Sequence, residues 1–179
     1  IEPDMAIFGK GIANGYPISA IIGKKHIMNA AQDSFISSTF WSERIGFAAA
    51  LASIDKFEKK EVYNDLINYG ETINEGWQRI SNKYNIDIKI SGIPPLTTLK
   101  FDYNDSLLLQ TLYAKFMLKH GFLLGNAVYT TYAYNKKIIK KFIDASEKSF
   151  EKISEFITND KLESLKKDEI IQMGFKRLT

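Results

Sequence analysis

The sequence predicts an α/β protein in two parts, an α/β segment over residues 1–58 and an α+β domain over residues 59–179. Three observations predict this division. Short apolar runs near the N-terminus are separated by glycine-rich turns, as in the buried strands of α/β sheets. Beyond Lys59, segments with a helical period alternate with segments that have the period of a strand. The charged run Lys59-Lys60-Glu61 marks the change between the parts.

The first part is expected to contain two strands and two helices. Residues 5–8 form an apolar run that predicts a short buried strand, and a second strand is expected over residues 18–22, ended by Gly23. A short helix over residues 24–31 would carry His26, which we interpret as a surface histidine. Ser42 is the expected N-cap of a helix over residues 43–57, because serine hydroxyls accept hydrogen bonds from free N–H groups.

A long helix and a pair of strands are expected to open the second part. Apolar and aromatic residues recur at steps of three and four and predict a core-facing helix over residues 62–84: Leu66, Tyr69, Ile73, Trp77, Ile80 and Tyr84. Isoleucines that alternate with polar residues from Ile86 to Ile90 then predict a half-buried strand. Gly92 and Pro94-Pro95 interrupt it before a second strand over residues 96–101.

The C-terminal third alternates helix, strand and helix. Asp105 or Ser106 would cap a helix that ends at His120-Gly121, where a glycine C-cap is typical. Its expected inward residues are Leu108, Leu112 and Phe116. Residues 122–124 predict a short strand, residues 125–134 a loop and residues 136–159 a long helix, with a further helix expected in the tail over residues 161–179. The helices should lie on one face of a small sheet.

A lysine within a glycine-rich turn is the most informative motif of the chain. Lys10 follows the first apolar run directly and stands between Gly9 and Gly11. Glycines permit left-handed or crowded backbone there, and the ends of strands are where ligands of open α/β folds bind. If apolar neighbours desolvate the amine, it becomes a better nucleophile toward carbonyls. From the local pattern alone, a solvated surface lysine is an equally open interpretation.

Several other kinds of site are excluded or disfavoured by the sequence. A phosphate-binding P-loop fails, because Asp4 and Gly11 stand where its first glycine and its Ser or Thr are required. The chain has no cysteine and only two histidines, so we expect no metal site. Lysines and acidic residues are mixed at a net charge of +3, so we expect no nucleic-acid partner. No apolar run is long enough to span a membrane and no signal peptide is visible, so we expect a cytoplasmic protein without a membrane partner.

Hydroxyl and aromatic side chains gather in residues 37–42, Ser-Ser-Thr-Phe-Trp-Ser. They are favoured as turn and cap residues ahead of the helix. Hydroxyls and free N–H groups near a helix start would also suit an anion such as phosphate, which remains the open alternative.

These segments together resemble a known family. The run Pro3-Asp4-Met5-Ala6-Ile7-Phe8-Gly9-Lys10 and the following Ile12-Ala13-Asn14-Gly15-Tyr16-Pro17 resemble the cofactor-lysine segment of class III aminotransferases, which are pyridoxal-phosphate (PLP) enzymes of fold type I. The branch of glutamate-1-semialdehyde 2,1-aminomutases is the most similar. Ser38-Thr39-Phe40 and residues 119–124 extend the resemblance at the level of pattern.

The resemblance implies roles for three residues. Lys10 would form the Schiff base with PLP and then move a proton between substrate and cofactor carbons. Thr39, with Ser38 beside it, would bind the cofactor phosphate, and in this family Thr39 does so on the partner subunit of a homodimer with a shared active site. The turn at Gly15 would let the backbone pass close to the site. Residues 1–58 would then be the C-terminal part of the large PLP-binding domain, and residues 59–179 the C-terminal small domain.

The resemblance also implies a longer parent protein. The chain opens on Ile1 and runs at once into a strand, so we expect it to be the C-terminal part of such an enzyme and inactive alone. The family's carboxylate at the pyridine nitrogen, its phosphate loop and its stacking aromatic would lie upstream.

The expected reaction is transfer of an amino group between a small-molecule donor and acceptor, with the substrate open. Two alternatives remain. The first is a 2,1-aminomutase, disfavoured because the loop over residues 125–132 is shorter than in that branch and lacks its acidic residue. The second is a non-catalytic fragment that keeps the fold.

Overall fold

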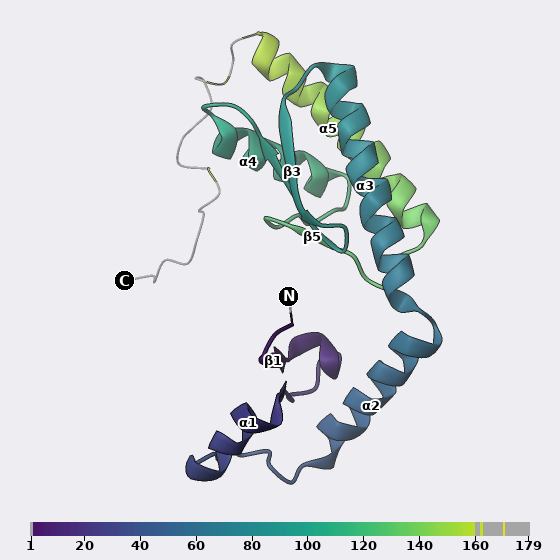
Figure 1. Cartoon of the computed structure of the whole chain (residues 1–179). Coiled ribbons are helices and arrows are strands. Elements are labelled where there is room, and N and C mark those ends of the chain that lie inside the picture. Colours follow the sequence, from purple (N-terminus) through teal and green to yellow (C-terminus); the bar gives the residue numbers. More distant parts are fainter. Residues whose placement is uncertain (1, 160–161, 163–169, 171–179) are drawn as a thin grey trace. The chain divides into compact units, whose positions relative to one another are not determined.

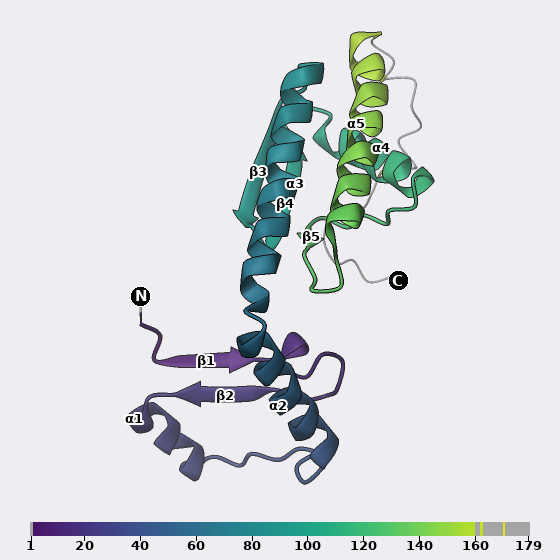
Figure 2. The same cartoon turned by 90° about the vertical axis from the view of Figure 1, so that its right-hand side faces the viewer.

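The computed structural model describes residues 2–159, 162 and 170, which form two compact units over residues 1–62 and 63–179. Figures 1 and 2 together label their helices and strands. Unit 1 contains β1 (Met5–Phe8), a 3-10 turn (Lys10–Ile12), β2 (Ala20–Gly23), α1 (Lys25–Met28), a second 3-10 turn (Asn29–Asp33) and α2 (Arg44–Lys59). Unit 2 contains α3 (Val62–Tyr84), β3 (Ile88–Ile93), β4 (Leu96–Phe101), α4 (Ser106–Lys119), β5 (Val128–Tyr129) and α5 (Lys136–Thr158).

In unit 1, β1 and β2 form an antiparallel ribbon that pairs Met5 with Gly23 and Phe8 with Ala20. The strand at residues 5–8 is confirmed, but the prediction that it is buried is wrong. Ile7 is 70% exposed, and Met5 and Phe8 are exposed too. An apolar strand is buried only where layers cover both of its faces, and within the described residues this ribbon has only two strands.

The helix α2 starts at Arg44, and its N-cap is Glu43 rather than the predicted Ser42. The Glu43 carboxylate accepts hydrogen bonds from the backbone N–H groups of Ile45 at 2.8 Å and Gly46 at 3.1 Å. The Glu43 side chain folds back over the first turn of α2 and takes the place of the serine, threonine, aspartate or asparagine that usually forms an N-cap. Gly46 lies against Ile18, so a small residue is required at that contact.

Replacing Glu43 with alanine is expected to lower the free energy of unfolding of the full-length protein by about 1 kcal/mol, because two N–H groups of α2 lose their acceptor. Urea denaturation measures this change. The matched control is Ser42→Ala, which removes the hydroxyl that the sequence favoured and should change stability by no more than about 0.5 kcal/mol. A larger loss at Ser42 than at Glu43 would contradict the observed cap.

Unit 2 is a three-stranded antiparallel sheet in the order β3-β4-β5, with helices on one face. Leu99 and Phe101 of β4 are buried in the core with residues of α3, α4 and α5. Their cross-strand partners are Ile90 and Ile88, so the alternation expected for these strands is confirmed. Figure 2 shows α3 alongside β3 and β4, where the Thr97 hydroxyl donates to Asn74 Oδ1 at 2.7 Å.

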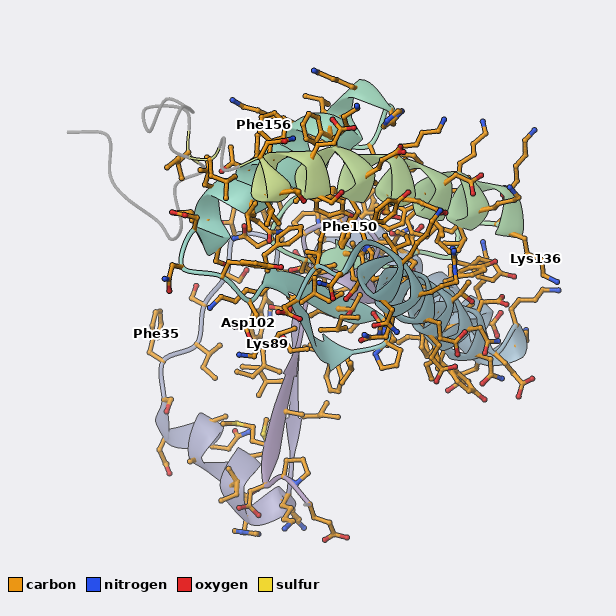
Figure 3. The ribbon with its side chains drawn as sticks, turned by 90° about the horizontal axis from the view of Figure 1, so that it is seen from above. Phe35, Lys89, Asp102, Lys136, Phe150 and Phe156 are labelled. Carbon is orange, nitrogen blue, oxygen red and sulfur yellow. The ribbon has the colours of Figure 1, made fainter. Side chains whose placement is uncertain are left out.

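The opposite face of this sheet is polar. Lys89 and Lys100 are cross-strand partners there, and Lys89 forms an ion pair with Asp102 at 2.8 Å. Figure 3 shows Lys89 beside Asp102, whereas Phe150 of α5 lies among the side chains of the core. The sheet is therefore covered by helices on one face only, as predicted.

The predicted strand at residues 122–124 is wrong, because the third strand is β5 at Val128–Tyr129, inside the predicted loop. The register pairs Leu96 with Tyr129 and Thr97 with Val128. The helix α4 ends where the sequence predicts, since His120 is its C-cap and Gly121 adopts a φ of +85°. The faces of α4 differ in detail: Leu109, Tyr113 and Met117 are its most buried residues, not Leu108 and Phe116. The helix expected in the tail lies outside the described residues.

A chain of buried hydrogen bonds joins the three long helices of unit 2. Trp77 Nε1–H of α3 donates to the Tyr113 hydroxyl of α4 at 2.9 Å, and that hydroxyl is 2.8 Å from Ser146 Oγ of α5. Burial raises the pKa of Tyr113 far above its usual range, while its hydrogen bonds oppose this shift. The phenol therefore stays neutral and can serve both neighbours.

Removing the Tyr113 hydroxyl as Tyr113→Phe is expected to lower the free energy of unfolding by about 2 kcal/mol, because the buried Trp77 N–H and the Ser146 hydroxyl both lose a partner. Chemical denaturation of the full-length protein measures the loss. Tyr129→Phe serves as the control, since Tyr129 is 66% exposed. Equal stability of the two variants would refute a structural role for the buried chain.

Among the described residues, no helix is both long and apolar enough to cross a membrane.

Candidate active site around Lys10

Lys10 adopts a backbone conformation that is unusual for a residue with a side chain. It is the first residue of the turn that follows β1, and its φ is +51°. Non-glycine residues in the left-handed region cost of the order of 1 kcal/mol and concentrate at functional sites. Further along the same loop, Gly15 has a φ of +110°, so the glycine expected in that turn has a conformational reason. Asn14, Glu61 and Asn85 share this conformation, so the role of Lys10 has to be argued from its surroundings.

Lys10 lines a cavity of about 1170 Å³ within unit 1. The cavity lies among the loop after β1, the strand β2, the loop after α1 and the start of α2. Its apolar wall includes Met5, Ile18, Ile21, Phe40, Trp41 and Phe47. Its polar lining includes Ser19, Ser34, Ser37 and Ser38. Small-molecule sites commonly occupy roughly 300–1,000 Å³, so the space suffices for a cofactor together with a substrate.

The cavity brings together some of the predicted site residues. Ser38 lines it with Lys10, whereas Thr39 is exposed and is not part of its lining. The Ser38 hydroxyl accepts a hydrogen bond from the backbone N–H of Phe40 at 3.4 Å, so its own proton is free to be donated. The N-cap of α2 is Glu43 and not a residue of the segment 37–42. The Ser38 hydroxyl is therefore available for an anion.

Two charged side chains line the cavity, Lys10 and Glu43. Both Glu43 oxygens accept backbone hydrogen bonds of α2, so this carboxylate is committed to the helix. Lys10 is exposed within unit 1, and its ammonium faces no ion-pair partner among the described residues. It is therefore the one charged group of this lining that remains available for chemistry.

The aromatic side chains of this cavity have no role among the sequence-based predictions. Phe40 and Trp41 form part of its wall, and Trp41 is 66% exposed. The sequence signal for their place in the cavity is that the two aromatic residues are adjacent in a turn and not part of a helical stripe. Within the described residues, no group of three or more His, Cys, Asp or Glu side chains is placed to hold a metal ion.

The model of the family described as aminotransferase class-III matches residues 1–159. The chain belongs to the class-III aminotransferase family. Its resemblance to this family, and its place in the α/β fold type I class, are confirmed.

Members of the family with differing names are similar to this chain. The 2'-deamino-2'-hydroxyneamine transaminase of Streptomyces kanamyceticus is 31% identical over 150 residues, which are 81% of this chain and 38% of the relative. The glutamate-1-semialdehyde 2,1-aminomutase 2 of Lachnoclostridium phytofermentans is 30% identical over 141 residues, covering 71% of this chain and 33% of the relative. The chain therefore spans little more than a third of the length of these relatives.

The PLP-containing structure of the FumI protein of Sphingopyxis sp. MTA144 has the same fold. It matches 88% of this class-III aminotransferase chain and 39% of its own at a TM-score of 0.81 and 25% identity. The family is PLP-dependent, and the residues of the Lys10 cavity fit part of such a cofactor. The cavity offers an amine for the aldehyde, a free hydroxyl for the phosphate and an apolar wall for the ring.

Proposed function

We propose that the full-length protein is a PLP-dependent aminotransferase in which Lys10 holds the cofactor covalently. One observation carries the proposal: the family's lysine segment places Lys10 in a left-handed backbone conformation at the wall of a cavity that also exposes the Ser38 hydroxyl. Residues 1–58 belong, in this proposal, to the large PLP-binding domain and residues 59–179 to the small domain. The chain spans only 38% and 33% of the two relatives described above, so these residues account for part of such a site.

The side chain of Lys10 has two tasks in this reaction. When bound, PLP carries the amino group between donor and acceptor and withdraws electrons from the carbon that bears it. Neutral Lys10 Nζ first acts as a nucleophile toward the aldehyde and then, released, as a general base. It removes a proton from the amino-bearing carbon of the donor and returns one to the carbonyl carbon of the acceptor. The donor carbon becomes a carbonyl and the acceptor carbon an amine, so two electrons pass between them without an external oxidant.

Ser38 and Thr39 are proposed to bind the cofactor phosphate. The Ser38 hydroxyl is free to donate within the cavity of its own chain. Thr39 is exposed in the neighbouring turn and does not line that cavity. This position supports a role for Thr39 at the phosphate of a second subunit, in a homodimer with a shared active site.

Borohydride reduction of the full-length protein with PLP, followed by peptide mapping, tests the attachment site. We expect the phosphopyridoxyl group on the peptide that contains Lys10. Lys24, at the other end of the β1–β2 ribbon, is an internal control, since its ammonium is paired with Asp4 at 2.7 Å and should stay unmodified. Modification at Lys24 instead of Lys10 would contradict the assignment.

A second candidate function is a 2,1-aminomutase, because an aminomutase is among the relatives at 30% identity. An aminomutase moves the amino group within one molecule and needs no separate donor or acceptor. Incubating the enzyme with a donor alone and then with donor plus acceptor separates the two reactions. We expect product to accumulate only when both are present.

A further inference from the structure

A second left-handed residue lies in the loop that carries Lys10. Asn14 has a φ of +46° and is followed by Gly15 at a φ of +110°. Within the described residues, neither the Asn14 amide nor the Gly15 N–H has a hydrogen-bond partner. A Cβ built on Gly15 would meet no atom within 4 Å beyond its chain neighbours, so the peptide after Asn14 has room to rotate. A free side-chain amide thus stands beside a free and unhindered N–H group.

These two groups can react with each other. The Gly15 nitrogen attacks Cγ of Asn14, the new N–C bond closes a cyclic imide, and the Cγ–Nδ2 bond breaks. Ammonia leaves with the proton of the Gly15 N–H. Water then opens the imide, at Cγ to give aspartate or at the main-chain carbonyl to give isoaspartate, in which the main chain runs through Cβ and Cγ. No electron is transferred, and water is the only co-reactant.

Asn85 provides the comparison within the same chain. It is exposed like Asn14 and has a φ of +50°. Its successor is Ile86, whose N–H donates to the Ser81 carbonyl at 3.1 Å. This N–H has to be released before it can attack, and the β-branched side chain crowds the peptide. A left-handed asparagine is therefore not enough; the free N–H of the following glycine distinguishes Asn14.

We propose that Asn14 is a site of spontaneous covalent modification in the full-length protein, at which an imide with Gly15 forms and hydrolyses to aspartate and isoaspartate. Both reacting groups belong to adjacent residues, so the reaction needs neither a ligand nor a partner. Asparagine is among the residues that limit the chemical durability of proteins.

Isoaspartate at this position changes the main chain of the Lys10 loop. The Tyr16 N–H donates to the Ala13 carbonyl at 3.3 Å, across the bonds that isoaspartate lengthens by one methylene. Ala13 is 1% exposed and anchors this turn in unit 1. The turn therefore cannot keep its geometry around the inserted group. We expect the modification to disturb the attachment of PLP at Lys10, a consequence that rests on the proposed function of this lysine.

Peptide mapping of the stored full-length protein tests the modification directly. Trypsin cuts after lysine, and the resulting peptides 11–24 and 84–89 contain Asn14 and Asn85 as their only amide side chains. After storage at mildly alkaline pH, the gain in mass reports conversion in each peptide, and fragmentation identifies isoaspartate. We expect Asn14 to convert at least about fivefold faster than Asn85, the factor that corresponds to one net hydrogen bond. Conversion of Asn14 no faster than that of Asn85 would overturn the proposal.

Two variants at the same position test the consequence for Lys10. Asn14→Gln keeps a neutral amide, but its longer side chain closes the imide far more slowly. It should keep its borohydride-reducible PLP through storage, whereas the original protein loses it as isoaspartate accumulates. Asn14→Asp adds the charge without the methylene and should retain more PLP than the aged protein.

The outcomes separate the modification from the function. Equal loss of PLP from stored Asn14→Gln and from the original protein would refute the consequence for Lys10. If freshly prepared protein is not labelled at Lys10 at all, the proposed function fails, while the conversion of Asn14 is still decided by the peptide masses. That measurement uses the original protein alone and does not depend on the folding of a variant.

Discussion

Replacing Lys10 with alanine in the full-length protein is expected to reduce amino transfer at least about 100-fold, the usual contribution of a positioned general base. Alanine at a φ of +51° is no more strained than lysine, so the turn should keep its shape. The loss would therefore come from the missing amine rather than from unfolding. Steady-state rates with a donor and an acceptor measure it, and circular dichroism verifies the fold.

Two further variants sharpen the experiment at Lys10. Lys10→Arg retains the positive charge but cannot become a neutral nucleophile, so it should be as inactive as Lys10→Ala. Lys25→Ala removes an exposed lysine of α1, outside the cavity lining, and should leave the rate within about twofold of the original. Normal turnover of Lys10→Ala would refute the proposed role of this side chain.

Replacing Gly70 with alanine is expected to lower the free energy of unfolding by about 3 kcal/mol, a severe case of overpacking. Helix propensity alone predicts the opposite, since glycine to alanine within a helix normally stabilises by about 1 kcal/mol. Gly70 lies in α3, and a Cβ built on it would overlap the backbone carbonyl of Pro94. That carbonyl belongs to the hairpin between β3 and β4, so relief requires the helix and the hairpin to separate.

Gly76→Ala is the matched control for Gly70 within the same helix. A Cβ at Gly76 would meet side-chain atoms of Ile143, the nearest at 3.0 Å, and a side chain can move where a backbone carbonyl cannot. The gain in helix propensity should offset most of this crowding, leaving a change within about 1 kcal/mol. Urea denaturation of both variants measures the difference. A Gly70→Ala variant as stable as Gly76→Ala would contradict the close approach of α3 to the hairpin.

The long amphipathic helices and the hairpin could be predicted from the sequence because their signals are local and repeated. The stripe from Leu66 to Tyr84 predicts α3, and Pro94-Pro95 marks the turn of the hairpin. The third strand was misplaced because Val128 and Tyr129 become a strand only by pairing with β4. No periodicity within two residues can carry that information.

Predictions about the site divide in the same way. The lysine turn was evident because Gly9-Lys10-Gly11 is a contiguous motif, and the ending of β1 fixes its place. The Glu43 cap was missed because it depends on a side chain folding back on its own helix, which residue preferences rank below a serine. The shared cavity of Lys10 and Ser38 was beyond prediction from spacing, since a turn and two loops have to converge on it.

The hydrogen bonds from Trp77 through Tyr113 to Ser146 link α3, α4 and α5 in the dry interior of unit 2. Tyr113 stands in the middle, so α4 cannot swing outward without stranding a polar group on each neighbouring helix. Moving α4 alone would break both hydrogen bonds of Tyr113, so local opening of this helix costs more free energy than the loss of one hydrogen bond. The three helices of unit 2 are therefore expected to open together rather than one at a time.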